Sequence, residues 1–393
     1  MEPSAPRSQS TAMSIEGEYG GELVFLQATP FCNIDCDYCY LQGRDDKNRM
    51  SLETLRLTLE RVREFGSTNG TYCLVWHVGE PLVVPIDWYR QAHQLCSELL
   101  ADKPLELHFQ TNGTLITPAW VEFIKSNPRI QVGISLDGPA RIHDAHRRSR
   151  NGSPTHARVM KGVGLLKEAG IPFNCIAVVT EEALDCPDEL YEFFAGLGPR
   201  MVSLNAENVD GANLTSSLGG ADREVRYRRF LRRIADLHLS TGKFLIRNFL
   251  WAQLRVKAIA EGTWREDPVD GNRLNQPWRI LSVDWQGRFH TYSPSLLGME
   301  VPHVGKWLGN VQTDSIRSVM CSGKFAQLQA EIDLGIEKCR RECRYFDRCG
   351  GGSPAHKFFE HRSFAVSESA ECRLGVQADW DAYLAAAEEF VLR

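Results

Sequence analysis

The stretch PFCNIDCDYC, residues 30–39, places three cysteines in one short segment of the chain. The apolar run LVFL at residues 23–26 precedes it, so the cysteines are expected in a loop after a β-strand. Thiolates suit soft metals, and a four-iron cubane cluster normally takes one cysteine for each iron. Cys32, Cys36 and Cys39 would leave one iron open to another ligand, as a catalytic cluster needs. The alternatives are a zinc loop completed by a remote residue and three unrelated thiols.

The composition is that of a globular protein with two or three domains. The chain has 393 residues, of which 43% are hydrophobic and 24% charged, and its formal net charge of -5 does not indicate a nucleic-acid partner. No apolar run approaches the roughly 20 residues that a membrane helix needs. The polar start MEPSAPRSQSTAMS lacks a signal-peptide core, so we expect a cytoplasmic location and a disordered leader at residues 1–21. The 12 cysteines are then expected to be reduced.

Apolar and helical segments alternate along the first two-thirds of the chain. Ser51 is expected to cap the first helix, and Thr117-Pro118 to begin the third. Six βα units predict a parallel sheet with helices outside it. Because a closed barrel needs eight units, we expect a partial (β/α)6 barrel or an open doubly wound sheet. The expected strands are residues 23–31, 71–78, 105–110, 130–136, 173–179 and 201–205.

Ligands of such folds bind at the carboxyl ends of the strands. Polar residues follow the predicted strands of this chain and are therefore expected to line one mouth. Gln110 and Asn112 could instead serve their turn, and His77 also fits a packed strand end. The segments are the cysteine loop, His77-Val78-Gly79-Glu80-Pro81, Gln110-Thr111-Asn112, Ser135-Leu136-Asp137-Gly138 and residues 205–208.

A second cysteine group lies near the end of the chain. Cys339, Cys343 and Cys349 have C-x3-C-x5-C spacing, and Cys372 follows 23 residues later. Four thiolates can hold one iron–sulfur cluster or one structural zinc ion. The remaining cysteines are expected to be small buried hydrophobes: Cys73, Cys96, Cys175, Cys186 and Cys321.

The segment CNIDCDYC, with Tyr38 before its last cysteine, resembles the signature of the radical S-adenosylmethionine (SAM) superfamily. The resemblance covers residues 22–375 and implies that an open iron of a 4Fe–4S cluster binds SAM. Cleavage of SAM then gives methionine and a 5′-deoxyadenosyl radical, which abstracts hydrogen from an unactivated carbon. The GGEP segment of the superfamily, whose backbone receives the SAM amino group, matches Val78-Gly79-Glu80-Pro81. Valine at its first position is compatible with backbone contacts unless φ there is positive.

The same resemblance assigns further residues to the SAM site. Ser135 and an arginine soon after it, Arg147 or Arg148, resemble the groups that hold the carboxylate and ribose of SAM in peptide maturases. A solvated loop charge is the alternative for the arginine. Tyr38, Gln110 and Asn112 are expected at the same site.

The second cysteine group resembles the SPASM extension of radical SAM peptide-modifying enzymes, which holds two auxiliary clusters in its full form. Residues 281–289 resemble its hairpin, but Tyr292 stands where the second hairpin cysteine would be, and the first has no counterpart. Ser353 stands at the fourth position of the cysteine run. The resemblance therefore implies one auxiliary 4Fe–4S cluster. Its ligands would be Cys339, Cys343, Cys349 and Cys372.

Several stretches narrow the resemblance to GrrM-type enzymes and, less closely, to their XyeB and FxsB relatives. They are LQATPFCNIDCDYCYLQGRDDKNRMS, LVWHVGEPLVVP, FQTNGTLI, VGISLDGPARIHDAHR and CGGGSPAHKFFE. This implies a ribosomally made precursor peptide in which an aromatic ring carbon is joined to the β-carbon of a residue two positions along, a three-residue cyclophane. The alternatives are thioether formation, epimerisation, sulfatase-type oxidation, or a non-catalytic metal-binding scaffold.

Cyclophane formation implies a base, because the ring adduct must lose one electron and one proton. The auxiliary cluster is the implied electron acceptor. In sulfatase-maturing relatives an aspartate takes the proton, but the matching position here is about Ser293. Asp284, Asp137 and Glu207 are the candidates; Asp284 could instead cap its turn, and Asp137 could order its loop.

These observations predict a partial barrel over residues 22–240, a helical bridge over 241–276 and a SPASM-like domain over 277–393. The expected partners are the precursor peptide and an external one-electron reductant of flavodoxin or ferredoxin type. The peptide leader would bind to the barrel, to residues 210–276, or to another protein.

Overall fold

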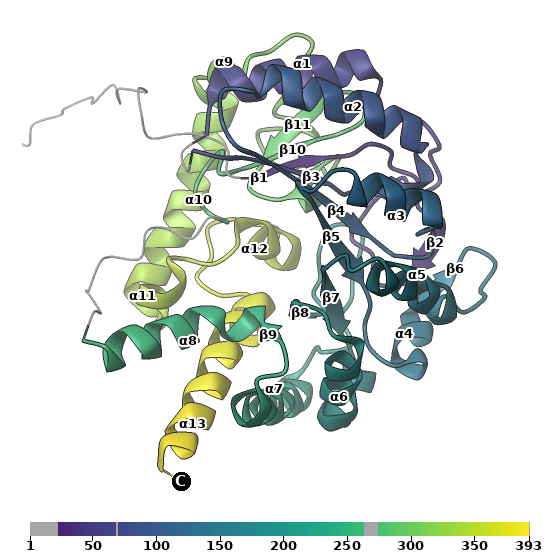
Figure 1. The fold of residues 1–393 in the computed structure, drawn as a ribbon. Coiled ribbons are helices and arrows are strands. Elements are labelled where there is room, and N and C mark those ends of the chain that lie inside the picture. Colours follow the sequence, from purple (N-terminus) through teal and green to yellow (C-terminus); the bar gives the residue numbers. More distant parts are fainter. Residues whose placement is uncertain (1–22, 68–69, 263–273, 393) are drawn as a thin grey trace, which may run out of the picture.

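The computed structural model describes residues 23–67, 70–262 and 274–392 (Figure 1). The leader predicted for residues 1–21 lies outside the described residues, as do residues 263–273 of the predicted bridge.

The fold is an α/β partial barrel with a C-terminal extension, as predicted. The six predicted strands are confirmed as β1, β3, β4, β5, β7 and β8, which pair in parallel in chain order. Short strands extend the described sheet at both edges. The bounds are β1 (Leu23–Leu26), β3 (Tyr72–Trp76), β4 (Leu105–Thr111), β5 (Ile130–Ser135), β7 (Phe173–Val179), β8 (Met201–Ala206), β9 (Leu245–Ile246), β10 (Ile280–Val283), β11 (Arg288–Thr291) and β12 (Gly309–Asn310).

Helices α1 to α6 lie along the outer side of the curved sheet, and α10 to α12 lie on its other side (Figure 1). The expected caps are confirmed: Ser51 accepts a hydrogen bond from Thr54 N, and Thr117 accepts one from Trp120 N. The bounds are α1 (Leu52–Phe65), α2 (Ile86–Leu99), α3 (Pro118–Lys125), α4 (Ala140–His146), α5 (His156–Glu168), α6 (Pro187–Leu197), α7 (Ala221–Thr241), α8 (Arg247–Ala260), α9 (Ile316–Met320), α10 (Gly323–Glu342), α11 (Phe346–Cys349), α12 (Pro354–His361) and α13 (Ala378–Leu392), with single turns η1 (Pro81–Val83), η2 (Glu181–Ala183), η3 (Pro294–Leu296) and η4 (Cys372–Gln377).

Alternation along the strands separates the apolar core from a concave inner face. Trp76 of β3 is buried against Trp88 and Tyr89 of α2. Cys73 and Val75 project from the opposite face of the same strand and are only half-buried. The inner face of the sheet is therefore less covered than its helix-packed face.

The hairpin of β10 and β11 continues the barrel sheet, because β10 pairs in parallel with β1. At the other end of the sheet, α13 packs on α7 and α8. Segments on both sides of residues 263–273 thus contact the barrel directly.

Between β5 and α5 the chain forms α4 and the short strand β6 (Arg147–Ser149), and Ile142 and His143 are buried. The expectation of five buried cysteines was wrong in part. Cys321 is exposed at the carboxyl end of α9, and Cys73 and Cys186 are only half-buried.

None of the described helices is both long and apolar enough to cross a membrane.

Candidate active site at the barrel mouth

The three-cysteine loop is held between two parts of the barrel. Its short strand β2 (Ile34–Cys36) pairs antiparallel with β6, which places Cys36 opposite Arg147. Cys36 is buried and Cys32 and Cys39 are half-buried, and all three are free thiols. Burial raises the pKa of both Cys32 and Cys36 to about 12, and the charge of Cys39 acts in the same direction on each.

Two side chains from distant segments donate hydrogen bonds to these sulfurs. Arg147 Nη1 lies 3.8 Å from Cys36 Sγ, and Asn112 Nδ2 lies 3.7 Å from Cys32 Sγ. Donors of this kind stabilise thiolate ligands and tune the potential of a cluster. The three thiols therefore fit a 4Fe–4S cluster with one open iron.

The turn after β3 adopts a strained backbone conformation. Val78 has φ of 65°, which is costly for a β-branched residue, so the tolerance expected for valine here does not hold without strain. Its carbonyl accepts a hydrogen bond of 2.8 Å from Gln27 Nε2. Gly79 cannot be replaced without a shift, because a Cβ there would lie 2.0 Å from the carbonyl oxygen of Thr29.

Glu80 joins this turn to the end of β4. Its buried carboxylate accepts hydrogen bonds from Thr111 Oγ1 at 2.6 Å, Asn112 N at 2.8 Å and Leu82 N at 2.9 Å. Burial raises the pKa of Glu80 to about 7, and these three donors oppose the shift. Glu80 therefore fixes the position of the turn relative to Asn112.

Of the other residues expected at the SAM site, some lie at the barrel mouth and one does not. Gln110 Nε2 donates to Ser135 Oγ at 2.9 Å, so these two side chains meet at neighbouring strand ends. Arg147 is buried, whereas Arg148 is exposed and donates to the backbone oxygen of Asp144. Of the two arginines, the structure brings Arg147 to the cysteine loop.

Asp137 is bound by groups from three segments. It accepts hydrogen bonds from Tyr38 Oη, from Arg147 Nε at 2.9 Å and from Val178 N at 2.9 Å. Burial acts to raise its pKa, but Arg147, together with His143 and Tyr38, holds the pKa below its ordinary value. Asp137 therefore holds Tyr38 and Arg147 in position through hydrogen bonds.

The other two predicted bases also have local partners. Asp284 receives hydrogen bonds from Gln286 N and from the backbone and guanidinium of Arg288, as expected for the cap of a hairpin turn. Glu207 Oε2 accepts bonds from Ser217 N at 2.8 Å and from the Ser217 hydroxyl. A proton-accepting role for Asp137, Asp284 or Glu207 stays a prediction.

The four C-terminal cysteines come from four short segments. Cys339 lies in the last turn of α10, Cys343 follows that helix, Cys349 ends α11 and Cys372 begins η4. Cys339 Sγ lies 3.6 Å from the carbonyl oxygen of Gly351, two residues after Cys349. Burial raises the pKa of Cys349, and the charges of Cys343 and Cys339 act in the same direction. Cys349 in turn adds to the effect of burial in raising the pKa of Cys372 to about 12.

A buried lysine completes this group. Lys357 of α12 is almost fully buried, and its Nζ lies 3.1 Å from Cys339 Sγ and 3.4 Å from the carbonyl oxygen of Gly335. A Cβ on Gly352 would lie 3.1 Å from Cys372 Sγ and 3.7 Å from Lys357 Cε, so glycine at this position leaves space between the lysine and a second thiol. Sequence reasoning missed Lys357, because its only signal is a lysine on the apolar side of a short helix.

Tyr292 and Ser353, which stand where the SPASM resemblance would place cysteines, have different surroundings. Tyr292 is buried and donates its hydroxyl to Gln329 of α10. Ser353 is buried at the start of α12 without a side-chain capping bond.

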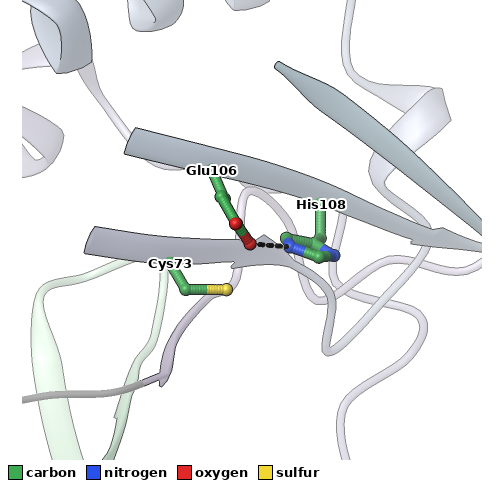
Figure 2. Close-up of side chains that lie close together, drawn as sticks. All are labelled: Cys73, Glu106 and His108. Atoms are coloured by element: carbon green, nitrogen blue, oxygen red, sulfur yellow. Dashed lines mark hydrogen bonds and ion pairs between the residues drawn. The ribbon is translucent and has the colours of Figure 1, made fainter. Parts of the chain in front are cut away.

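A third group of ligand-type side chains lies on the concave face of β3 and β4. Figure 2 shows Cys73, Glu106 and His108 directed toward one another. One ligand atom of each lies within 4.8 Å of the others, and His108 Nε2 is 3.4 Å from Glu106 Oε2. These are zinc-type ligands, but there are only three, and the Glu106 side chain is 51% exposed. We assign no metal to them.

Comparison with known proteins identifies the class that this fold and site define. The model of the radical SAM superfamily matches residues 26–194. The serine-type anaerobic sulfatase-maturating enzyme of Bacteroides thetaiotaomicron is 33% identical over 360 residues, which cover 83% of this chain and 81% of that enzyme. The chain belongs to the radical SAM superfamily, in the group that includes the anaerobic sulfatase-maturating enzymes. It is a radical SAM enzyme, and its cofactors are a 4Fe–4S cluster and SAM.

Other relatives extend over most of the chain. The uncharacterized protein sll1766 of Synechocystis is 38% identical over 374 residues, covering 93% of this chain and 92% of that protein. Among solved structures, native anSMEcpe with bound AdoMet and Cp18Cys peptide has a TM-score of 0.74 at 21% identity, covering 94% and 97% of the two chains. Streptococcus suis SuiB bound to precursor peptide SuiA has a TM-score of 0.65 at 16% identity, covering 91% of this chain and 77% of that chain. At these identities the structural likeness establishes the fold.

Proposed function

We propose that this enzyme modifies a ribosomally made precursor peptide by joining an aromatic ring carbon to the β-carbon of the residue two positions along. The observation that carries the proposal is the barrel mouth, where the cysteine loop, the 78–81 turn and the ends of β4 and β5 converge above a half-open inner face. The bound peptides in the anSMEcpe and SuiB structures support a peptide as substrate. The five GrrM-like stretches support the cyclophane as product.

The residues at the barrel mouth have distinct roles in this proposal. A 4Fe–4S cluster and SAM, when bound, supply the 5′-deoxyadenosyl radical that removes hydrogen from carbon. Cys32, Cys36 and Cys39 hold the cluster, while Asn112 and Arg147 orient two of the sulfurs. Gln27 and Glu80 keep the 78–81 turn in place for the SAM amino group, and Gln110 with Ser135 faces the remaining polar groups of SAM.

The four C-terminal cysteines hold one auxiliary 4Fe–4S cluster in this proposal. Tyr292 and Ser353 support a single auxiliary site, because neither is a thiol and both are buried in protein. A zinc ion held by the same four cysteines is the competing arrangement. The proposed electron source is a small one-electron donor of flavodoxin or ferredoxin type.

A second candidate is the sulfatase-type oxidation of a serine or cysteine that the sequence resemblance leaves open, since serine-type and cysteine-type sulfatase-maturating enzymes are among the relatives. The 33% identity to the Bacteroides enzyme favours it. Ser293 argues against this second candidate, because the sulfatase-maturing enzymes that the chain resembles have a proton-accepting aspartate at about this position.

A peptide probe separates the two candidates. A synthetic peptide containing Trp-Ala-Asn has a ring and a β-carbon at the required spacing but neither serine nor cysteine. With reconstituted enzyme, SAM and reductant, we expect 5′-deoxyadenosine and a peptide lighter by two hydrogen atoms, with the link between Trp and Asn found by tandem mass spectrometry. The matched peptide containing Leu-Ala-Asn has no ring and should stay unlinked. Oxidation of a serine peptide, with Trp-Ala-Asn untouched, would overturn the proposal.

A further inference from the structure

A cluster of half-buried polar side chains at the barrel mouth has no part in the site described above. Tyr40 follows the last cysteine of the loop, and its hydroxyl lies 3.0 Å from Nε2 of His77, the residue before the 78–81 turn. Burial lowers the pKa of His77 to about 4, so its neutral ring can accept a hydrogen bond from the tyrosine hydroxyl. Asp210, in the loop after β8, and His356 of α12 complete the cluster. Its members come from four separate segments.

The loop that carries Asp210 is seated tightly on Tyr40. Ala212 N donates to the Tyr40 carbonyl at 2.8 Å, and Asp210 and Asn213 exchange two backbone hydrogen bonds. Gly211 has φ of 54°, and a Cβ there would lie 2.2 Å from the Tyr40 oxygen. The close approach therefore requires glycine and keeps Asp210 beside the cysteine loop.

Asp210 and His356 each leave one buried atom without a partner. His356 Nε2 lies 3.8 Å from Asp210 Oδ2. Asp210 Oδ1 and His356 Nδ1 have no hydrogen-bond partner among the described residues. Buried polar atoms are nearly always paired, so an unpaired atom on each of these neighbouring residues points to a ligand that is bound there during the reaction.

The surroundings of Asp210 differ from those of the three predicted bases. Asp137 and Asp284 are each paired with an arginine, and Glu207 is bound to a serine. Burial raises the pKa of Asp210 above its ordinary value, while His356 and the Ser295 hydroxyl act in the opposite direction. A carboxylate that no arginine neutralises suits general-base work better than one held by arginine.

We propose that Asp210, positioned by His356, accepts the proton that the ring adduct releases. This rests on the proposed function. One β C–H bond of the substrate breaks as its hydrogen atom passes to the 5′-deoxyadenosyl radical, giving 5′-deoxyadenosine, and the substrate carbon radical forms one C–C bond to the ring. The adduct then loses the C–H proton to Asp210 Oδ1 and one electron to an acceptor of the iron–sulfur class, which restores the aromatic ring.

The test separates hydrogen abstraction, the first step, from loss of the ring proton, the last. The reconstituted full-length enzyme is given SAM, reductant and the Trp-Ala-Asn peptide deuterated at the asparagine β-carbon. Deuterium in 5′-deoxyadenosine reports hydrogen abstraction, and the linked peptide reports completion. In Asp210→Asn we expect deuterium transfer to persist while linked peptide falls on the order of 10²-fold or more. Asp185→Asn, which changes an exposed carboxylate on the loop before α6, is the matched control and should behave as wild type.

Chemical rescue distinguishes a base from a structural carboxylate. Asp210→Ala leaves space beside His356, and added formate should restore linked peptide without changing deuterium transfer. Linkage at the wild-type rate in Asp210→Asn would refute the proposal. So would an equal fall of deuterium transfer and linkage that formate does not reverse. Failure of the proposed function is seen separately, because the wild type would then give no linked peptide.

Discussion

The two cysteine groups differ in how their neighbouring cations are balanced. At the barrel mouth, Arg147 donates to Cys36 but is itself paired with the buried carboxylate of Asp137. In the extension, Lys357 donates hydrogen bonds to Cys339 and to a backbone carbonyl, and it forms no ion pair with a carboxylate of the described residues. The cation beside the first group is thus neutralised by a carboxylate, whereas the cation beside the second group is not.

This difference indicates different electronic roles. Positive charge and hydrogen bonds near the sulfurs stabilise the reduced, more negative state of a cluster and raise its potential. A cluster held beside Lys357 would therefore accept an electron more readily than one held beside the Arg147–Asp137 pair. That order suits a barrel site that donates an electron to SAM and an extension site that receives one from the substrate.

Removing the three cysteines of the loop is expected to have the largest effect, because it eliminates one of the two compared sites. Replacing Cys32, Cys36 and Cys39 with alanine should lower the reconstituted iron content from about eight to about four atoms and abolish 5′-deoxyadenosine formation. Iron assay and chromatography measure both. Cys321→Ala, at an exposed thiol outside both groups, serves as the control. A wild-type content of about twelve irons would contradict the single auxiliary site.

The converse change removes one ligand of the extension. Cys343→Ala should leave uncoupled SAM cleavage, because the barrel site is intact, but linked peptide should disappear. Metal binding contributes to folding, so a thermal melt must accompany the assay. If a well-folded Cys343→Ala enzyme links peptide at the wild-type rate, the auxiliary site is structural only.

A smaller effect is expected when only the charge beside the auxiliary site is removed. Lys357→Met keeps most of the buried volume but loses the ammonium, so the midpoint potential of the auxiliary cluster should fall while that of the barrel cluster stays unchanged. A redox titration followed by electron paramagnetic resonance resolves the two. Lys324→Met, at a lysine bound to the Trp307 carbonyl, is the matched control. Equal potentials in wild type and Lys357→Met would remove the proposed difference between the sites.

The smallest effect is expected at the vacant position of the cysteine run. Ser353→Cys restores one thiol of the missing SPASM cluster, but one thiolate cannot hold four irons. Iron content and Mössbauer spectra should match the wild type. A new cluster signal in this variant would mean that further ligands of that cluster are present and were misassigned.

Some features of this protein follow from sequence alone because they depend on short-range patterns. The apolar segments predict the six parallel strands of the barrel, and the spacing of Cys32, Cys36 and Cys39 predicts the loop after β1. The caps at Ser51 and Thr117 depend on neighbours three residues away. The two cysteine groups could likewise be found without a structure.

Tertiary structure decided what each polar side chain contacts. Arg147 and Arg148 are adjacent in the sequence, yet only the pairing of β2 with β6 turns Arg147 toward Cys36. The positive φ at Val78 reflects the packing of Gly79 against Thr29, far away in the chain. Asp210 and His356 meet only after the loop beyond β8 and helix α12 reach the same mouth. Their contacts arise from chain segments far apart in sequence, and local periodicity carries no information about such distances.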